Sequence, residues 1–270
     1  MTFGRQPQNN GYTNQQYQGN PNYRAQQPYG FNNDSTAAIP TQSAYSYERA
    51  EHTSMTRAYG EMAIGLLVTA AVAYLTYASG LLYSFIRTTG SLGWIGLCIV
   101  QVVFAISLSA KVMQMKTSTG RLMFYAYAAL MGFTLSSVFA MYSVPTLLVA
   151  LVTSAGFFFS LTMLGLTTKK NMLGWGSILM GALIALIVVQ VALLFIAPSN
   201  TAMKVIATLG IVLFSVLTMH DAQQTRAIFA NYRNQGTDVI ERVSILCALN
   251  LYLDFVNLFL YILEIFGARN

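Results

Sequence analysis

The segment Val243–Phe266, with the sequence VSILCALNLYLDFVNLFLYILEIF, decides the fold of this chain. At about 1.5 Å of rise per residue, a helix of this length crosses the roughly 30 Å of hydrocarbon in a bilayer. One acid, Asp254, lies near its middle, where a charge costs about 2.5–3.5 kcal/mol even on the lenient insertion scale. We therefore predict a transmembrane helix in which Asp254 faces the interior of a bundle or a wet cavity.

Polar side chains recur every three or four residues along this segment, which places them on one helical face. They are Cys247, Asn250, Asp254, Asn257, Tyr261 and Glu264. The opposite face carries leucine, phenylalanine, valine and isoleucine. Such a stripe indicates either the lining of an internal path or a helix enclosed by others, and a structural hydrogen-bond network is the alternative.

Six further apolar runs precede this segment, at residues 58–79, 92–110, 122–142, 146–166, 172–197 and 202–219. The first connection falls at Thr88–Gly90, and only the link between the sixth and seventh runs, Arg226–Arg242, is long. Backbone polar groups are not left unpaired in lipid, and the runs lack the alternation of barrel strands, so we predict helices. A charged content of 9%, against about a quarter in soluble domains, agrees with an all-α membrane protein of seven spans.

The N-terminal segment differs from the rest of the chain. Residues 1–47 are rich in Gln, Asn, Tyr, Gly and Ser, and they contain four of the six prolines. Too few aliphatic side chains are present to offset the entropy of ordering, so we predict a disordered cytoplasmic tail. The tail is either a partner-binding tether or a dispensable linker, and residues 48–270 form the membrane domain.

The basic residues predict the orientation of the chain. With the N-terminus in the cytoplasm, ten basic residues fall on the inner side: Arg49, Arg57, Lys111, Lys116, Arg121, Lys169, Lys170, Arg226, Arg233 and Arg242. The outer side receives three: Arg87, Lys204 and Arg269. This bias follows the positive-inside rule and puts the C-terminus outside.

Two other acids have candidate partners. Asp221 lies near the cytoplasmic end of the sixth span, beside His220. If it met Asp254, the two carboxylates would share a proton and form a titratable pair. The expected depths differ by about 10 Å, so pairing requires the seventh helix to begin earlier or to shift. Glu61 follows Arg57 by four residues, and we predict an interfacial ion pair between them.

Several function classes find no support in the sequence. The chain lacks HExxH, GxSxG and intramembrane GxGD motifs, and it has no P-loop or dinucleotide fingerprint, so we expect no enzyme and no cofactor. The net charge of +6 forms no basic patch, which argues against nucleic-acid binding. No Cys/His cluster assigns a metal site.

Three stretches resemble the Bax inhibitor-1 family, in its bacterial YccA-like branch. They are Met55–Gly60 (MTRAYG), Ala129–Ser137 (ALMGFTLSS) and Leu251–Phe259 (LYLDFVNLF). The resemblance covers about residues 50–270. It implies seven helices with the last one central and enclosed by the other six, in a multi-pass protein of the bacterial inner membrane.

The resemblance also implies a function. Family members are expected to be pH-sensitive Ca²⁺ leaks in which two aspartates of the sixth and seventh spans form a latch, and Asp221 and Asp254 match those positions. Some members carry an arginine near the end of the second span, for which Lys111 is the nearest substitute here. Further candidates for lining the path are Asn250, Asn257 and Glu264.

The alternative is a membrane scaffold whose tail binds a partner such as a membrane-bound protease, without conducting ions. This reading also rests on the resemblance to YccA-like members. Deleting the tail would separate the two readings, because a leak would survive the deletion and a tail-dependent modulator would not.

Overall fold

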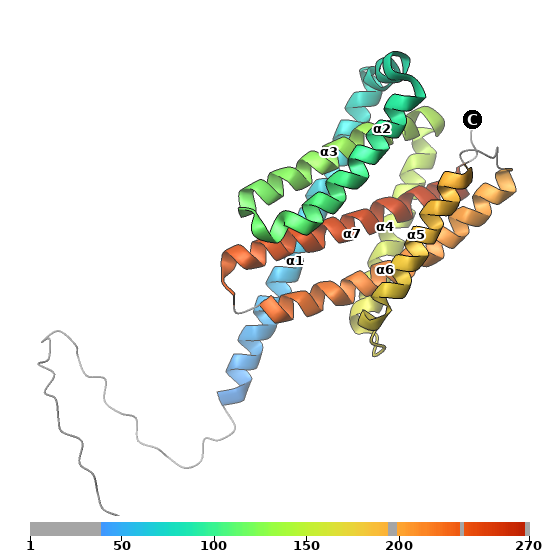
Figure 1. The fold of residues 1–270 in the computed structure, drawn as a ribbon. Coiled ribbons are helices and arrows are strands. Elements are labelled where there is room, and N and C mark those ends of the chain that lie inside the picture. The colour runs from blue at the N-terminus through green and yellow to red at the C-terminus, as the bar shows by residue number, and fades with distance from the viewer. Residues whose placement is uncertain (1–38, 194–198, 233–234, 268–270) are drawn as a thin grey trace, which may run out of the picture. The chain divides into compact units, whose positions relative to one another are not determined.

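The computed structural model describes residues 39–193, 199–232 and 235–267, with side chains from residue 55 onward (Figure 1). Within these ranges seven helices are long and apolar enough to cross a membrane, which confirms the predicted all-α architecture. The elements are α1 (Ile39–Ala78), α2 (Leu81–Lys111), η1 (Val112–Gln114), α3 (Thr117–Met141), α4 (Val144–Thr167), η2 (Leu173–Trp175), α5 (Gly176–Leu193), α6 (Asn200–Tyr232) and α7 (Thr237–Phe266).

Helix α1 begins at Ile39, inside the segment that the sequence assigns to the tail. The rest of that segment, residues 1–38, lies outside the described residues, so its expected disorder stays a prediction. Residues 43–270 form one compact unit.

The last helix lies at the centre of the bundle. In its most apolar stretch 67% of the residues are buried, whereas no other span exceeds 33%. Figure 1 shows α7 running between α1–α3 and α4–α6, and its backbone packs against α3, α4, α6 and η1. Leu249, Leu251 and Leu258 of α7 are completely or almost completely buried in the main hydrophobic core. A helix that is apolar on most sides is stable only when other helices cover it.

The first connection is not where the sequence placed it. The chain turns at Ser79–Gly80, where Gly80 adopts a φ of 69°, and α2 begins at Leu81. The expected turn at Thr88–Gly90 is instead a kink inside α2, at a Gly90 with φ 64° and ψ −159°. Both positions use glycine because side-chain-bearing residues rarely adopt a positive φ. The apolar run 81–87 is thus helical, and the kink at Gly90 separates it from the long stretch of α2 that follows.

The long link expected between the sixth and seventh spans is mostly helical. Helix α6 continues to Tyr232 and α7 starts at Thr237, so only residues 233–236 connect them. Gly236 precedes α7 with a φ of 81°. At about 1.5 Å per residue both helices are longer than a bilayer requires, and they pack side by side as a helical hairpin.

Close backbone contact joins α4 to α6 beside Asp221. A Cβ atom added at Gly165 would lie 2.6 Å from the carbonyl oxygen of Met219. Gln223 of α6 also donates from Nε2 to the Gly165 carbonyl at 2.9 Å. A glycine at this position therefore sets how closely α4 approaches the part of α6 that carries Asp221.

Candidate functional site

Asp254 lies in the middle of α7 and is only 5% exposed. Its Oδ2 atom is buried and has no hydrogen-bond partner among the described residues. A buried oxygen without a partner loses its hydration and gains nothing in return, which costs about 1–3 kcal/mol and more for a charged group. The acid that the sequence singles out is therefore enclosed, as expected, and no ion pair joins it to a basic side chain in the described part of the chain.

Asp221 of α6 is held by its chain neighbour. Its Oδ1 atom lies 2.7 Å from Nδ1 of His220, and the His220 side chain is largely buried. The charges of Asp221 and Asp254 interact, but no hydrogen bond joins the two carboxylates in the described part of the chain. From the sequence, the two acids could approach only if α7 began earlier than expected or shifted. Helix α7 does begin earlier, at Thr237.

Two hydroxyl groups from other helices lie near these acids. Tyr59 of α1 lies beside Thr162 of α4, and the charges of Asp254 and Asp221 act on it. The Tyr59 and Thr162 hydroxyls are both buried, and they interact with each other although their geometry is looser than that of an ordinary hydrogen bond. We call Tyr59, Thr162, Asp221 and Asp254 the acidic cluster. Buried polar groups are nearly always bonded, so the Oδ2 atom of Asp254, which has no partner among the described residues, marks this cluster as unusual.

Cys247 lies one and a half to two turns before Asp254 on α7 and borders the acidic cluster. It is buried next to Thr225 of α6, and the charge of Asp221 acts on it. The predicted polar stripe thus begins against α6.

The later part of the predicted stripe is bonded to its neighbours. Asn257 donates from Nδ2 to the Leu253 carbonyl of its own helix at 2.8 Å. Glu264 accepts a hydrogen bond from the Tyr142 hydroxyl at 3.0 Å, and Gln190 donates to the Tyr261 hydroxyl at 2.8 Å. Glu264, Tyr261 and Gln190 border a cavity of about 540 Å³ among α3, α5, α6 and α7. The later half of the stripe therefore forms the structural hydrogen-bond network that the sequence left open as an alternative.

Two weaker candidates do not join the cluster. Asn250 is half-buried and makes no hydrogen bond through its side chain to any described residue. Lys111 is exposed at the end of α2, and no ion pair between it and Asp221 exists among the described side chains. The structure therefore gives no contact through which Lys111 would act on the sixth-span acid.

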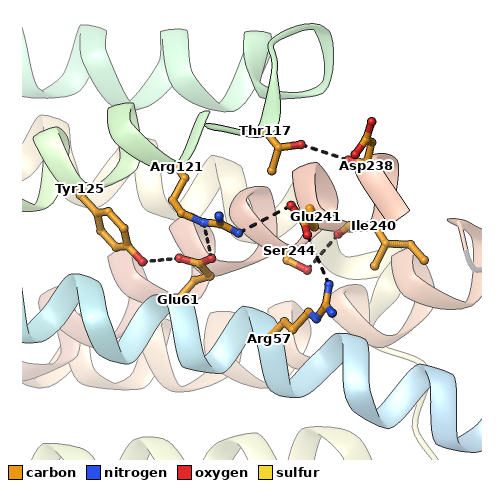
Figure 2. A network of polar contacts seen from close by, with 9 residues as sticks. All are labelled: Arg57, Glu61, Thr117, Arg121, Tyr125, Asp238, Ile240, Glu241 and Ser244. Atoms are coloured by element: carbon orange, nitrogen blue, oxygen red, sulfur yellow. Dashed lines mark hydrogen bonds and ion pairs between the residues drawn. The ribbon is translucent and has the colours of Figure 1, made fainter. Parts of the chain in front are cut away.

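A network of charged and polar side chains fixes the start of α7 (Figure 2). Arg121 of α3 donates from Nε to Glu61 of α1 at 2.7 Å, and its Nη2 lies 3.8 Å from Glu241 of α7. Arg57 of α1 lies 3.6 Å from the other oxygen of Glu241, and the Tyr125 hydroxyl bonds to Glu61. We call these five residues the charged clamp. It connects α1, α3 and α7.

The clamp corrects one prediction. The sequence suggested that Glu61 pairs with Arg57, four residues earlier on the same helix. Glu61 instead pairs with Arg121, and Arg57 reaches Glu241. The bundle brings a third helix within reach, and the Arg121 guanidinium can contact two carboxylates at once because it is planar and carries several donors.

Sequence reasoning missed Tyr59 and Thr162. Tyr59 lies within the run Met55–Gly60, whose resemblance to known sequences was the available signal. Thr162 is a lone hydroxyl in a long apolar span, and no spacing distinguishes it from the other serines and threonines there. Its role emerges only when α4 is placed beside α1.

Comparisons with known proteins agree with this architecture. The sequence profile of the family described as "Inhibitor of apoptosis-promoting Bax1" matches residues 51–270. The chain is 35% identical to the inner membrane protein YbhL of Escherichia coli over 217 residues, which covers 80% of this chain and 92% of YbhL. It is 34% identical over 211 residues to the uncharacterised protein YrjE of Lactococcus lactis, covering 77% and 88% of the two chains.

A protein of Borreliella burgdorferi, also uncharacterised, is 30% identical over 215 residues, covering 80% of this chain and 91% of its own. Together with the seven apolar helices, these matches extend over the whole described membrane domain. The chain is therefore a multi-pass membrane protein that belongs to the Bax inhibitor-1 family.

Proposed function

We propose that this protein is a passive, pH-sensitive cation leak, with Ca²⁺ as the conducted ion and the acidic cluster as its gate. The observation that carries the proposal is the unpaired Oδ2 atom of Asp254, buried inside a seven-helix bundle. Ionisable groups within membrane spans are costly and mark ion paths and proton relays more often than structural contacts.

The groups around Asp254 suit weak transit better than tight binding. Asp221 of α6 and Tyr59 of α1 interact with Asp254, and Cys247 of α7 interacts with Asp221 and Tyr59. Ca²⁺ takes six to eight oxygen ligands, and two carboxylates with two hydroxyls supply only part of that number. His220 lies against Asp221. The acids would attract a cation that enters, and water would supply the rest of its ligands.

The pH response follows from the same groups. Asp254 gains or loses a charge when it exchanges a proton, and this change alters the attraction for a cation. Removing the titratable group at Asp254 should therefore remove most of the pH response.

The test is Ca²⁺ flux into proteoliposomes at several pH values. We expect Asp254→Asn to lower the flux at least ten-fold and to flatten its pH profile. Asp238→Asn is the matched control, since it makes the same acid-to-amide change on α7 at an exposed position. Flux and pH dependence that stay at wild-type levels in Asp254→Asn would overturn the proposal.

A deletion tests whether the leak depends on the tail. A chain lacking residues 1–47 should conduct as the full chain does, because the acidic cluster lies entirely within α1, α4, α6 and α7. Loss of flux in the deletion, with the membrane domain still folded, would favour the scaffold reading, in which the tail engages a membrane-bound protease or another partner.

We further propose that the protein lies in a bacterial inner membrane with the N-terminus in the cytoplasm and the C-terminus outside. The relative YbhL is named an inner membrane protein. The basic residues that follow α2 and α4 support the orientation through the positive-inside rule. Reporter fusions at the two termini should show opposite locations, and equal locations would contradict it.

A further inference from the structure

A basic groove lies at the end of the bundle where α4 leads into α5. It has a volume of about 430 Å³ and runs between this connection and α6. Its polar lining consists of Thr168, Lys169, Lys170, Asn171, Gln223 and Arg226. Three of these side chains are cationic, and no acidic residue lines the groove within the described ranges. The groove therefore attracts anions.

The two lysines have no competing partner in the described structure. Lys169 and Lys170 are exposed, and neither forms an ion pair with a described acid. Arg226 completes the basic lining from α6, and its Nη1 atom lies 3.5 Å from the Leu166 carbonyl. The lysine charges are thus available to a ligand without breaking an ion pair to any described side chain.

Gln223 holds the groove in shape. Its Nε2 atom donates to the carbonyls of Gly165 and Lys170, both at 2.9 Å, and its Oε1 atom accepts from the Met172 backbone at 2.9 Å. Asn171 adds a turn by accepting from the Leu173 backbone at 3.0 Å. Ordering a binding loop in advance lowers the entropy that a ligand must overcome.

Exposed apolar side chains adjoin the groove. Leu173 lines it and is 43% exposed, and Trp175, two residues further along η2, is 52% exposed. Tryptophan is enriched at the level of lipid headgroups, where its ring contacts acyl chains and its N–H reaches water. A soluble anion would use only the charged floor, whereas a lipid would use the floor for its phosphate and the adjoining apolar side chains for its acyl chains.

We propose that this groove binds the phosphate headgroup of an anionic phospholipid, such as phosphatidylglycerol. Basic pockets between transmembrane helices hold such headgroups by charge, and each lysine or arginine near the surface contributes to the affinity. The site is separate from the acidic cluster, so the proposal stands or falls independently of ion conduction.

The protein supplies its own reporter for the test. It contains two tryptophans, Trp94 in α2 and Trp175 beside the groove. In a Trp94→Phe background, the full chain is reconstituted into mixtures containing phosphatidylglycerol or phosphatidylcholine with brominated acyl chains, which quench nearby tryptophan. We expect brominated phosphatidylglycerol to quench Trp175 at several-fold lower mole fraction than brominated phosphatidylcholine.

The lysines should carry this preference. Each of Lys169→Gln and Lys170→Gln should reduce it, by no more than the roughly five-fold that one basic residue near a membrane surface contributes, and the double variant should abolish it. Lys116→Gln, which removes an exposed charge from the α2–α3 connection, is the matched control and should leave it unchanged. A second control, Trp175→Phe with Trp94 retained, should show no preference between the lipids.

Three outcomes would overturn the proposal. The first is equal quenching of Trp175 by both lipids. The second is a lipid preference that persists in the double variant Lys169→Gln/Lys170→Gln, or that Lys116→Gln reduces to the same extent. Either result would show that the preference depends on the overall charge of the protein and not on the groove. The third is relief of the quenching by millimolar glycerol phosphate or inorganic phosphate, which would show that the groove takes a free phosphate.

Discussion

The charged clamp and the acidic cluster are both polar regions of α7 packed against α1, yet their chemistry is opposite. In the clamp, Glu61 and Glu241 each contact an arginine, and Glu61 accepts a further bond from Tyr125. In the acidic cluster, Asp254 has a buried oxygen without a partner among the described residues, and the charged group that acts on it is another acid, Asp221. The clamp satisfies its charges within the protein, whereas the cluster leaves one unsatisfied.

This difference separates two roles of a carboxylate: holding helices together and exchanging a proton or a cation. A carboxylate bonded to arginine is stabilised in one place, because removing either partner leaves an uncompensated charge. A carboxylate without a partner can accept a proton or a cation without breaking an existing bond. The structure therefore assigns rigidity to the start of α7 and reactivity to its middle, and six substitutions test this contrast.

The largest effect should come from the centre of the clamp. Arg121→Gln removes the cation shared by Glu61 and Glu241 and should lower the free energy of unfolding by about 2–3 kcal/mol, the range for bonds to charged groups. Denaturant titration of the purified protein in mild detergent measures it. Lys116→Gln, an exposed neighbour in sequence, should change the value by less than about 0.5 kcal/mol. Similar values for both would show that the clamp does not stabilise the bundle.

The same acid-to-amide change should have different results in the two regions. Glu61→Gln weakens the bond to Arg121 and should destabilise the protein by about 1–2 kcal/mol. Asp254→Asn should cost less than about 0.5 kcal/mol or even stabilise, because a neutral group is cheaper to bury and no bond to Oδ2 is lost. Unfolding titrations of both variants side by side measure the difference. If Asp254→Asn were the more damaging of the two, Asp254 would be a structural residue.

Two tyrosines allow the same comparison with uncharged side chains, and the expected difference in stability is smaller. Tyr125→Phe removes the hydroxyl that bonds Glu61 and should cost about 1 kcal/mol. Tyr59→Phe removes a buried hydroxyl whose contact with Thr162 is looser than an ordinary hydrogen bond and should cost less than about 0.5 kcal/mol. The same titration compares them, and a loss at Tyr59 equal to that at Tyr125 would mean that its hydroxyl is bonded in solution.

The smallest effect should come from the edge of the clamp. Arg57 is 51% exposed and lies 3.6 Å from Glu241, so Arg57→Gln should cost less than about 0.5 kcal/mol. Raising the salt concentration should erase even this difference, because exposed charges are screened. A loss that approaches that of Arg121→Gln would show that Arg57 is an equal member of the clamp.

The sequence predicts those features that depend on one segment at a time. Apolar runs long enough to cross a bilayer revealed the spans, and the spacing of Asp254 and its polar neighbours predicted an inward face on α7. The partner of Glu61 was not predictable in this way, because the arginine four residues away satisfied the local rule while Arg121 is brought close only by packing. The turn at Gly80 and the kink at Gly90 could not be distinguished, since both glycines follow a hydroxyl residue, Ser79 and Thr89.

The acidic cluster shows the same limit. Asp221 and Asp254 were both identified from the sequence. Their expected depths in the membrane, however, depended on where α6 ends and α7 begins. The chain between Arg226 and Arg242 is mostly helical instead of a loop, which changes both positions. The hydroxyls of Tyr59 and Thr162 come from two other helices. Their position beside the acids depends on how four helices pack, which no single stretch of sequence specifies.

The central helix is also made after the six helices that surround it. Synthesis proceeds from the N-terminus, so α1 to α6 leave the ribosome before the segment around which they pack exists. Until α7 arrives, Tyr59, Thr162 and the inner faces of α3 and α4 lack the surface that buries them. The short connection at residues 233–236 delivers α7 directly alongside α6. A nascent chain stopped before Thr237 would therefore hold an unfilled core, and completion of the final span is the event that closes the bundle.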